Sequence, residues 1–278
     1  MRIAVVPNQS KSENDALVRT VSRRLAQLGA EVRVVFAESH LPTTAQLTEA
    51  LQGCDLAVAV GGDGTIVHVA KAAATVGCPV LGINGGHLGF LAGLEADELD
   101  ALPALLSGEY TVDERALLQV TVHTVEGDVT RYAMNEAVVS RGGLSRLVDV
   151  TVLADGAEVL SCRGDGVIIA TPTGSTAYSL SAGGPVVDPS VDCVLLTPVC
   201  PHSLDSRPRI WPADVTLTVD ARAADGTLAY VTVDGEENIP LGSNHTVTVR
   251  RAEVAVRLVQ LRRNSFYERL RRKLSDRR

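Results

Sequence analysis

The chain has 278 residues, 45% of them hydrophobic and 21% charged, so it can bury a full core and is not disordered by composition. This length allows one large domain or two ordinary ones. The formal net charge of −7 argues against nucleic acid as the main partner.

The first hundred residues alternate between short apolar runs and helical patterns. Strands are predicted at 3–6, 32–36, 56–60 and 79–83, and helices at 14–28 and 65–76. Near-continuous apolar strands separated by helices are typical of a parallel sheet that is covered on both faces. The sequence therefore predicts an α/β domain over residues 1–108, with ligands at the carboxyl ends of its strands.

The pattern changes near residue 110. Val, Thr and Leu then alternate with polar residues at 118–122, 148–152, 215–219 and 231–233, and turn signals stand at 154–156 and 224–226. This pattern predicts a β-rich second domain over residues 109–260.

The tail, residues 262–278, is strongly basic, and Phe266, Leu270 and Leu274 recur every four positions. This spacing predicts an amphipathic helix within 261–278 that docks its apolar stripe on the body of the protein. An anionic partner or a membrane surface is the alternative reading of the same charges.

The most informative motif is Gly61-Gly62-Asp63-Gly64-Thr65, which joins a buried strand to a helix. Glycine turns that open a helix bind phosphates through backbone N–H groups. A carboxylate would repel a phosphate, so Asp63 fits better as a base for a hydroxyl or as a metal ligand. A plain tight turn is the alternative. The chain has no Gly-Lys dipeptide, so a Walker-type P-loop is absent.

Two features near this turn are weaker candidates. A second glycine loop, residues 82–91 with Gly85 and Gly86, follows the next strand and would lie beside the first loop in a parallel sheet. It could wall the same phosphate-binding cleft, or be an irregular connection. His68 lies one helical turn after Thr65, where it is either a surface histidine or a ligand contact.

Polar residues also gather in the second domain. Asn135 and Glu136 interrupt an apolar run, which suits either a pair of sugar hydroxyls or an internal hydrogen-bond network. Residues 163–185 are dense in glycine, serine and threonine and contain no lysine, which suits a neutral nucleoside, with Tyr178 available to stack on a base. A Ser/Thr-rich loop or a Ser-His-Asp triad stays open at this point.

Together these motifs resemble those of the bacterial NAD kinase family. The resemblance rests on Gly-Gly-Asp-Gly-Thr at 61–65, Gly-Ile-Asn-x-Gly-x-Leu-Gly-Phe-Leu at 82–91, Asn-Glu at 135–136 and the motifs within 163–179. The first motif is shared with phosphofructokinases and lipid kinases, whereas those within 163–179 are far more specific. The resemblance implies a two-domain fold, with an α/β domain joined to a β-rich domain and the last segment returning to the first.

It also implies phosphorylation of the adenosine 2′-hydroxyl of NAD to give NADP. The donor is ATP or, in some members, polyphosphate, with a divalent cation (Mg²⁺ or Mn²⁺), and members form homodimers or homotetramers. Asp63 would accept the hydroxyl proton with Gly64 beside it, while Asn135 and Glu136 would bind ribose and base groups. The remaining dinucleotide contacts would be Arg146, Arg163, Asp165, Thr176, Ala177, Tyr178, Ser179, Leu180 and Ser181.

Two positions depart from the family pattern. His68 stands where many members carry Arg or Lys, so a phosphate contact there would be weaker and sensitive to pH. Glu236 falls where a neutral or basic residue is common, and we expect it near ribose hydroxyls or outside the site.

A lipid kinase and a catalytically silent dinucleotide sensor are the competing functions. The five scattered cysteines form no C-x-x-C pair, residues 1–7 are too short for a signal peptide's apolar region, and no apolar run approaches 18 residues. We therefore expect a cytoplasmic protein with neither a membrane nor a nucleic acid as partner.

Overall fold

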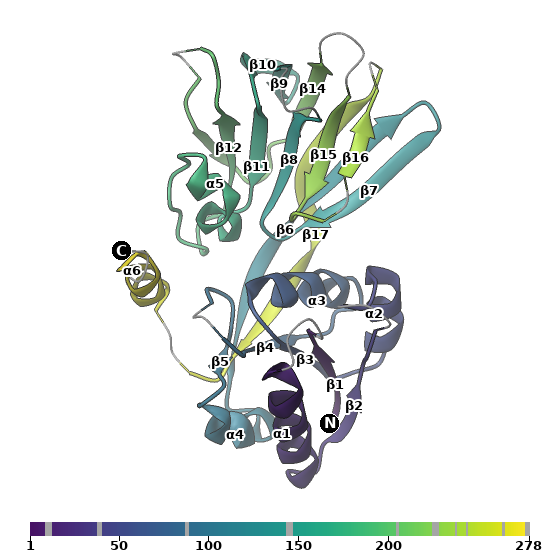
Figure 1. Ribbon diagram of the computed structural model, residues 1–278, viewed down its shortest axis with the longest axis vertical. Helices are drawn as coiled ribbons and strands as arrows, with labels where there is room; N and C mark the ends of the chain where they lie inside the picture. Colours follow the sequence, from purple (N-terminus) through teal and green to yellow (C-terminus); the bar gives the residue numbers. More distant parts are fainter. Residues whose placement is uncertain are drawn as a thin grey trace. The chain divides into compact units, whose positions relative to one another are not determined.

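The computed structural model describes the chain except for residues 9–12, 38–40, 87–88, 143–146, 204–205, 224–227, 237, 243, 263–264 and 276–278. The chain forms two compact units (Figure 1). Unit 1 comprises Met1–Arg115 and Val254–Arg278, and unit 2 comprises Ala116–Glu253. Unit 2 is shorter than the predicted 109–260, because Leu258 near the end of the last strand pairs with Val80 in unit 1.

Unit 1 is the predicted α/β domain. Its elements before residue 115 are β1 (Arg2–Pro7), α1 (Glu13–Gln27), β2 (Glu31–Val34), α2 (Thr44–Leu51), β3 (Leu56–Val60), α3 (Asp63–Thr75), β4 (Val80–Asn84), β5 (Leu94–Glu95), η1 (Leu99–Ala101) and α4 (Leu102–Ser107). Strands β2, β1, β3, β4 and β5 pair in parallel, which confirms the predicted sheet. The C-terminal helix α6 (Phe266–Ser275) also belongs to this unit.

The parallel sheet of unit 1 is buried because its central strands are apolar throughout. All five residues of β3 and of β4 are buried, as a sheet covered on both faces requires. Helix α2 was missing from the sequence prediction. A capping box marks its start, since the Thr43 side chain accepts from the Gln46 N–H and the Gln46 side chain accepts from the Thr43 N–H.

Unit 2 is the predicted β-rich domain. Its elements are β6 (Thr111–Thr124), β7 (Gly127–Ala133), β8 (Glu136–Arg141), β9 (Val148–Ala154), β10 (Ala157–Gly164), β11 (Gly166–Ala170), η2 (Thr173–Thr176), α5 (Tyr178–Ser181), β12 (Cys193–Val199), β13 (Arg209–Pro212), β14 (Leu217–Ala223), β15 (Ala229–Val233), β16 (Asn238–Leu241) and β17 (Thr246–Gln260). Strands β6 and β17 begin or end in unit 1.

Six strands of unit 2 form an antiparallel sheet in the order β13-β12-β11-β8-β15-β16. Strands β10, β9, β14 and β17 pair antiparallel in a second layer, and the two layers share one apolar core. The β9–β10 hairpin turns at Asp155 and Gly156, both with positive φ, as the predicted Asp-Gly turn requires.

Strand β8 places the polar residues of the second candidate site. Side chains alternate along a strand, and Ala137 and Val139 lie in the core between the two layers. Glu136, Val138 and Ser140 therefore project from the opposite face of the same sheet.

Candidate active site

The Gly61–Thr65 turn forms the start of α3, as the sequence predicted. Gly62 is the N-cap of this helix, and Asp63 is its first residue, where a negative charge complements the helix dipole. Gly61 passes close to Thr65, since a Cβ at this glycine would lie 2.6 Å from the Thr65 hydroxyl oxygen. That hydroxyl accepts a hydrogen bond from the Asn8 amide at 2.9 Å. Gly61 thus has no room for a side chain, whereas a Cβ at Gly62 or Gly64 would meet no atom within 4 Å.

The carboxylate of Asp63 faces the second glycine loop. Its Oδ2 accepts from the backbone N–H of Phe90 at 2.9 Å, and its Oδ1 accepts from that of Leu91 at 3.1 Å. Gly89 packs so closely on Oδ1 that a Cβ at this position would overlap it. The two glycine loops are therefore adjacent, as expected from the parallel pairing of β3 and β4.

Gly85 and Gly86 lie in a tight bend that Asn84 holds. The buried Asn84 side chain contacts the backbone of Gly86 and donates to Glu95 Oε2 at 2.7 Å. Burial raises the pKa of the Glu95 carboxyl, while the Asn84 hydrogen bond opposes that rise. His68 Nε2 lies 2.7 Å from the carbonyl oxygen of Pro42, so this nitrogen is the protonated one.

The structure adds two basic residues that sequence reasoning did not connect to this turn. Lys273 of α6 places its ammonium 3.1 Å from Asp63 Oδ2 and 4.2 Å from the centroid of the Phe90 ring. Arg269, one turn earlier, donates to the carbonyl oxygens of Phe90 and Ala92. The four-residue spacing in the tail predicted the helix and its docking, but no signal in the sequence identified Asp63 as the partner of Lys273.

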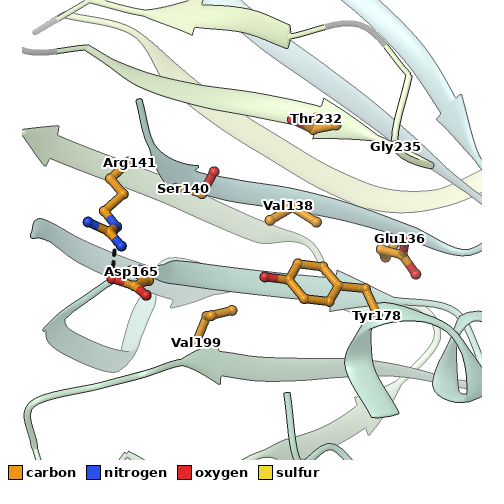
Figure 2. A pocket seen from close by; sticks show the side chains of 9 residues that line it. All are labelled: Glu136, Val138, Ser140, Arg141, Asp165, Tyr178, Val199, Thr232 and Gly235. Carbon is orange, nitrogen blue, oxygen red and sulfur yellow. Dashed lines mark ion pairs between the residues drawn. The ribbon is translucent and has the colours of Figure 1, made fainter. Parts of the chain in front are cut away.

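Unit 2 holds a cavity of about 490 Å³, within the usual size range of ligand pockets (Figure 2). Its lining comes from strands β8, β12 and β15, from the start of α5, and from the turns after β10 and β15. The lining residues are Glu136, Val138, Ser140, Arg141, Asp165, Tyr178, Val199, Thr232 and Gly235. Of the predicted site residues, the structure brings Glu136, Asp165 and Tyr178 together here.

Glu136 is a buried carboxyl group whose oxygens are only partly satisfied. It is 7% exposed, and its Oε2 has no hydrogen-bond partner among the described residues. Burial, reinforced by the neighbouring charge of Asp234, raises the pKa of Glu136 to about 7, and a hydrogen bond from the Tyr178 backbone opposes this rise. Glu136 lines the cavity, and an unpartnered buried acceptor in a lining residue is suited to a hydroxyl or N–H donor of a ligand.

Asp234 holds the segment that carries Glu136, and sequence reasoning missed this role. Its carboxylate accepts from the backbone N–H groups of Met134, Asn135 and Glu136 at 2.8, 2.8 and 3.0 Å. Asp234 itself adopts a φ of 50°, which Asp tolerates better than most residues. The Asp-Gly pair at 234–235 signals a turn, but a turn signal does not show which backbone the carboxylate will bind.

At the other end of the cavity, Asp165 pairs with Arg141. The Arg141 guanidinium lies 2.8 Å from Asp165 Oδ1, and both side chains are roughly one-quarter exposed (Figure 2). Sequence reasoning named Asp165 but not Arg141. Arg163, which it did name, is 56% exposed and pairs with Asp149 at 3.6 Å, because alternation along β10 turns its side chain outward.

The hydroxyl-rich stretch departs most from expectation. Among the six residues from Thr176 to Ser181, only Tyr178 lines the cavity. Ser179 is fully buried against the Thr197 hydroxyl, and Ser175 bonds the backbone of Val187. Buried hydroxyls need partners, and here the fold itself supplies them. Since neither partner is a histidine, these serines are not the nucleophile of a Ser-His-Asp triad.

The remaining predicted residues lie outside the cavity lining. Asn135 is half-buried, and its carbonyl oxygen accepts from the Thr171 N–H at 2.9 Å. Glu236 is exposed in the turn after β15, beside the lining residue Gly235. Arg146 lies outside the residues that the structure describes.

The structure thus combines an α/β unit, whose glycine turn presents a carboxylate, with a β-rich unit that holds a polar cavity, and the family matches assign this two-domain architecture to the phosphotransferases. Two family profiles match the chain, the ATP-NAD kinase N-terminal domain over residues 3–110 and the ATP-NAD kinase C-terminal domain over residues 134–261. The chain belongs to the NAD kinase family. This membership separates it from the lipid kinases that share the first motif.

Curated relatives agree with this assignment. The NAD kinase of Symbiobacterium thermophilum is 46% identical over 80% of this chain and 78% of its own length. The NAD kinase of Lachnoclostridium phytofermentans is 35% identical over 99% of both chains.

Solved structures have the same fold. An NAD kinase from Archaeoglobus fulgidus in complex with ATP matches 99% of both chains with a TM-score of 0.77 and 26% identity. Yeast NADH kinase complexed with NADH matches 97% of this chain and 85% of its own, with a TM-score of 0.82 and 24% identity.

Proposed function

We propose that this protein transfers a phosphoryl group to the 2′-hydroxyl of the adenosine ribose of NAD, which yields NADP, and that Asp63 accepts the hydroxyl proton. Membership in the NAD kinase family supports phosphorylation of NAD. The observation that carries the role of Asp63 is its carboxylate, which backbone N–H groups fix from both oxygens at the start of α3.

Among the residues that the structure describes, three donors contact the Asp63 carboxylate, which leaves one acceptor site for the substrate. An ionised carboxylate offers about four lone-pair sites, two on each oxygen. The Phe90 N–H and the Lys273 ammonium occupy those on Oδ2, and the Leu91 N–H occupies one on Oδ1. The fourth site, on Oδ1, is the one that we assign to the ribose hydroxyl. General-base assistance of this kind contributes about 10²–10⁴ in rate.

The cavity of unit 2 supplies the groups that we assign to the nucleoside of NAD. Glu136 Oε2 would accept a hydrogen bond from a ribose hydroxyl or a base N–H, which satisfies the buried oxygen. Tyr178 is 45% exposed at the cavity wall and offers an aromatic face for stacking. Arg141, held by Asp165, would contribute a cation toward the anionic dinucleotide.

For the donor, we propose ATP, and the ATP complex of the Archaeoglobus fulgidus relative supports this choice. No group of three or more His, Cys, Asp or Glu side chains able to hold a metal ion occurs within the described part of the chain. Because Mg²⁺ is usually held by substrate phosphates with one or two carboxylates, we expect Mg²⁺ or Mn²⁺ to arrive on the oxygens of the donor phosphates. An assay of NADP formation, run with polyphosphate in place of ATP, tests polyphosphate as a donor.

We further propose a cytoplasmic homodimer or homotetramer, on the basis of the family resemblance. In the described part of the chain no helix is both long and apolar enough to cross a bilayer. Light scattering of the purified protein measures the number of subunits.

The decisive experiment is Asp63→Asn, assayed with an NADP-specific dehydrogenase that detects only the 2′-phosphorylated product. We expect kcat to fall by about 10²–10⁴-fold while the Kd for NAD stays within about twofold of wild type. Asp15→Asn, an exposed position on α1, is the matched control and should leave kcat unchanged. If Asp63→Asn keeps a kcat near that of wild type, Asp63 does not have the catalytic role. If the wild-type protein binds NAD but forms no NADP with any of the donors tested, the protein is better described as a dinucleotide sensor.

A further inference from the structure

One face of the C-terminal helix α6 contacts the loop that binds Asp63. The ring centroids of Phe266 and Phe90 are 6.3 Å apart, and Arg269 donates to the carbonyl oxygens of Phe90 at 2.7 Å and of Ala92 at 2.6 Å. Residues 266, 269 and 273 are spaced i, i+3 and i+7, so they share a face of the helix. The same short loop therefore binds Asp63 through its N–H groups and α6 through its carbonyl oxygens.

The third residue of this face reaches the carboxylate itself. The ammonium of Lys273 lies 3.1 Å from Asp63 Oδ2, and the two side chains are 25% and 29% exposed. This ion pair is shielded more than those at an open surface, where long side chains lose their geometry to solvent. The Phe90 ring under the ammonium adds a cation–π contact at 4.2 Å.

Lysine is rare in this protein, which makes its place here informative. The chain has 23 arginines but only Lys11, Lys71 and Lys273. Lys71 is 5% exposed within α3, and Lys11 lies outside the described residues. A compact ammonium reaches one oxygen as a point charge, whereas a guanidinium prefers to bind two oxygens at once.

We propose that Lys273 is a positioning residue for phosphoryl transfer, and that Arg269 anchors α6 so that the Lys273 ammonium fixes the Asp63 carboxylate. This inference rests on the proposed role of Asp63 as the proton acceptor. Rotation of the carboxylate would break the contacts of Oδ2 with the Phe90 N–H and the Lys273 ammonium, so these contacts favour one direction for the acceptor site on Oδ1.

A cation beside a base is compatible with this reaction. The transition state of phosphoryl transfer is loose, and catalysis depends mainly on positioning and electrostatics. The orientation of the Asp63 acceptor site therefore matters more than its basicity. A misplaced group costs rate even where the substrate still binds, so loss of Lys273 should appear in kcat.

The test uses the full-length protein with Lys273→Met, which keeps the length of the side chain but removes its charge. We expect kcat to fall about 10- to 100-fold, with the KM values for ATP and NAD within about twofold of wild type. Lys273→Arg restores a cation and should recover kcat to within about fivefold of wild type. Arg272→Met removes one charge from an exposed position of the same helix and is the matched control, with no change in kcat expected.

Two results from the single variants would overturn the proposal. If Lys273→Met raises the KM for ATP and leaves kcat unchanged, Lys273 binds the donor phosphates instead. If kcat is unchanged or higher with KM also unchanged, the contact has no positioning role. Thermal unfolding of each variant shows whether a loss of rate comes from a loss of folded protein. Recovery of kcat in Lys273→Arg would show that the loss in Lys273→Met comes from the missing charge and not from misfolding.

A double variant separates this inference from the proposed function. If Lys273 acts through Asp63, adding Lys273→Met to Asp63→Asn should lower the residual kcat by less than about twofold. If the second substitution lowers kcat as much as it does in wild type, Lys273 acts independently of Asp63 and the inference is wrong. If Asp63→Asn alone keeps its rate, the proposed function itself fails, whatever Lys273 does.

Discussion

The buried carboxyl group of Glu136 makes the stability of unit 2 depend on pH, and Glu136→Gln removes that dependence. Burial and the charge of Asp234 raise the pKa of Glu136 from its ordinary 4.5 to about 7 in the folded protein. Glutamine has a similar shape but does not titrate, so the two proteins differ in a single ionisable group.

The sign of the effect follows from proton binding. Between pH 4.5 and 7 the folded state keeps a proton on Glu136 that the unfolded chain has already released. The free energy of unfolding therefore falls as pH rises through this window, and the loss is complete above the folded pKa. The gap between 4.5 and about 7 corresponds to a loss of roughly 3 kcal/mol. Below pH 4.5 the group contributes no loss.

The chain offers a convenient probe for this measurement. Its single tryptophan, Trp211, lies in β13 and packs against the core of unit 2, the same unit that holds Glu136. Urea titrations followed by Trp211 fluorescence between pH 4.5 and 8 give the free energy of unfolding of this unit for both proteins. All other ionisable groups are shared, so the difference between the two curves isolates Glu136.

We expect the wild-type curve to fall relative to the Gln variant by roughly 3 kcal/mol across the window. The absolute stability of the variant is not the criterion, since a buried amide brings its own hydrogen-bonding needs. Parallel curves from pH 4.5 to 8 would refute the reasoning, because they would show that Glu136 titrates alike in the folded and unfolded states.

Two further substitutions test the groups that hold the candidate site residues. Gly89→Ala places a Cβ against Asp63 Oδ1 and should lower kcat by about 10²-fold, because it displaces the carboxylate. The Kd for NAD should not change, and steady-state kinetics and equilibrium binding measure the two quantities. A normal kcat would contradict the close packing of Gly89 on Asp63. Asp234→Ala removes the acceptor of three backbone N–H groups and should destabilise unit 2 by about 3 kcal/mol in Trp211-monitored unfolding, while a change below about 0.5 kcal/mol would show that water replaces the carboxylate.

Much of unit 1 could be predicted from the sequence because its signals are local. Apolar runs such as Leu56–Val60 allow few structures other than a buried strand, and the glycines at 61 and 62 fix where the strand ends. Parallel pairing of neighbouring strands then brings the loop after β4 beside Asp63. The helix α2 was missed because its pattern is short, although the capping box at Thr43 marks its start.

The cavity of unit 2 was predicted less completely, because its side chains come from strands distant in sequence. Arg141 and Thr232 carry no motif, and the antiparallel pairing of β15 with β8 places their strands side by side at the cavity. Composition was misleading for the hydroxyl-rich stretch. Serine and threonine suit a ligand and an internal network equally well, and the choice depends on burial, which for Ser179 is complete.

The C-terminal helix shows why a correct prediction of structure did not yield its role. Periodicity in the tail gives the helix and the face that docks, but the partner depends on the path of β17, whose Leu258 pairs with β4. That pairing returns the chain to unit 1, where Arg269 and Lys273 reach the loop that follows the same strand β4. The composition of the tail suggests that its basic side chains are solvated, but the Lys273 ammonium contacts the carboxylate of Asp63. The position of β17 in the sheet determines whether Lys273 reaches Asp63. Mutations that shift the register of β17 should therefore lower kcat more than they weaken NAD binding.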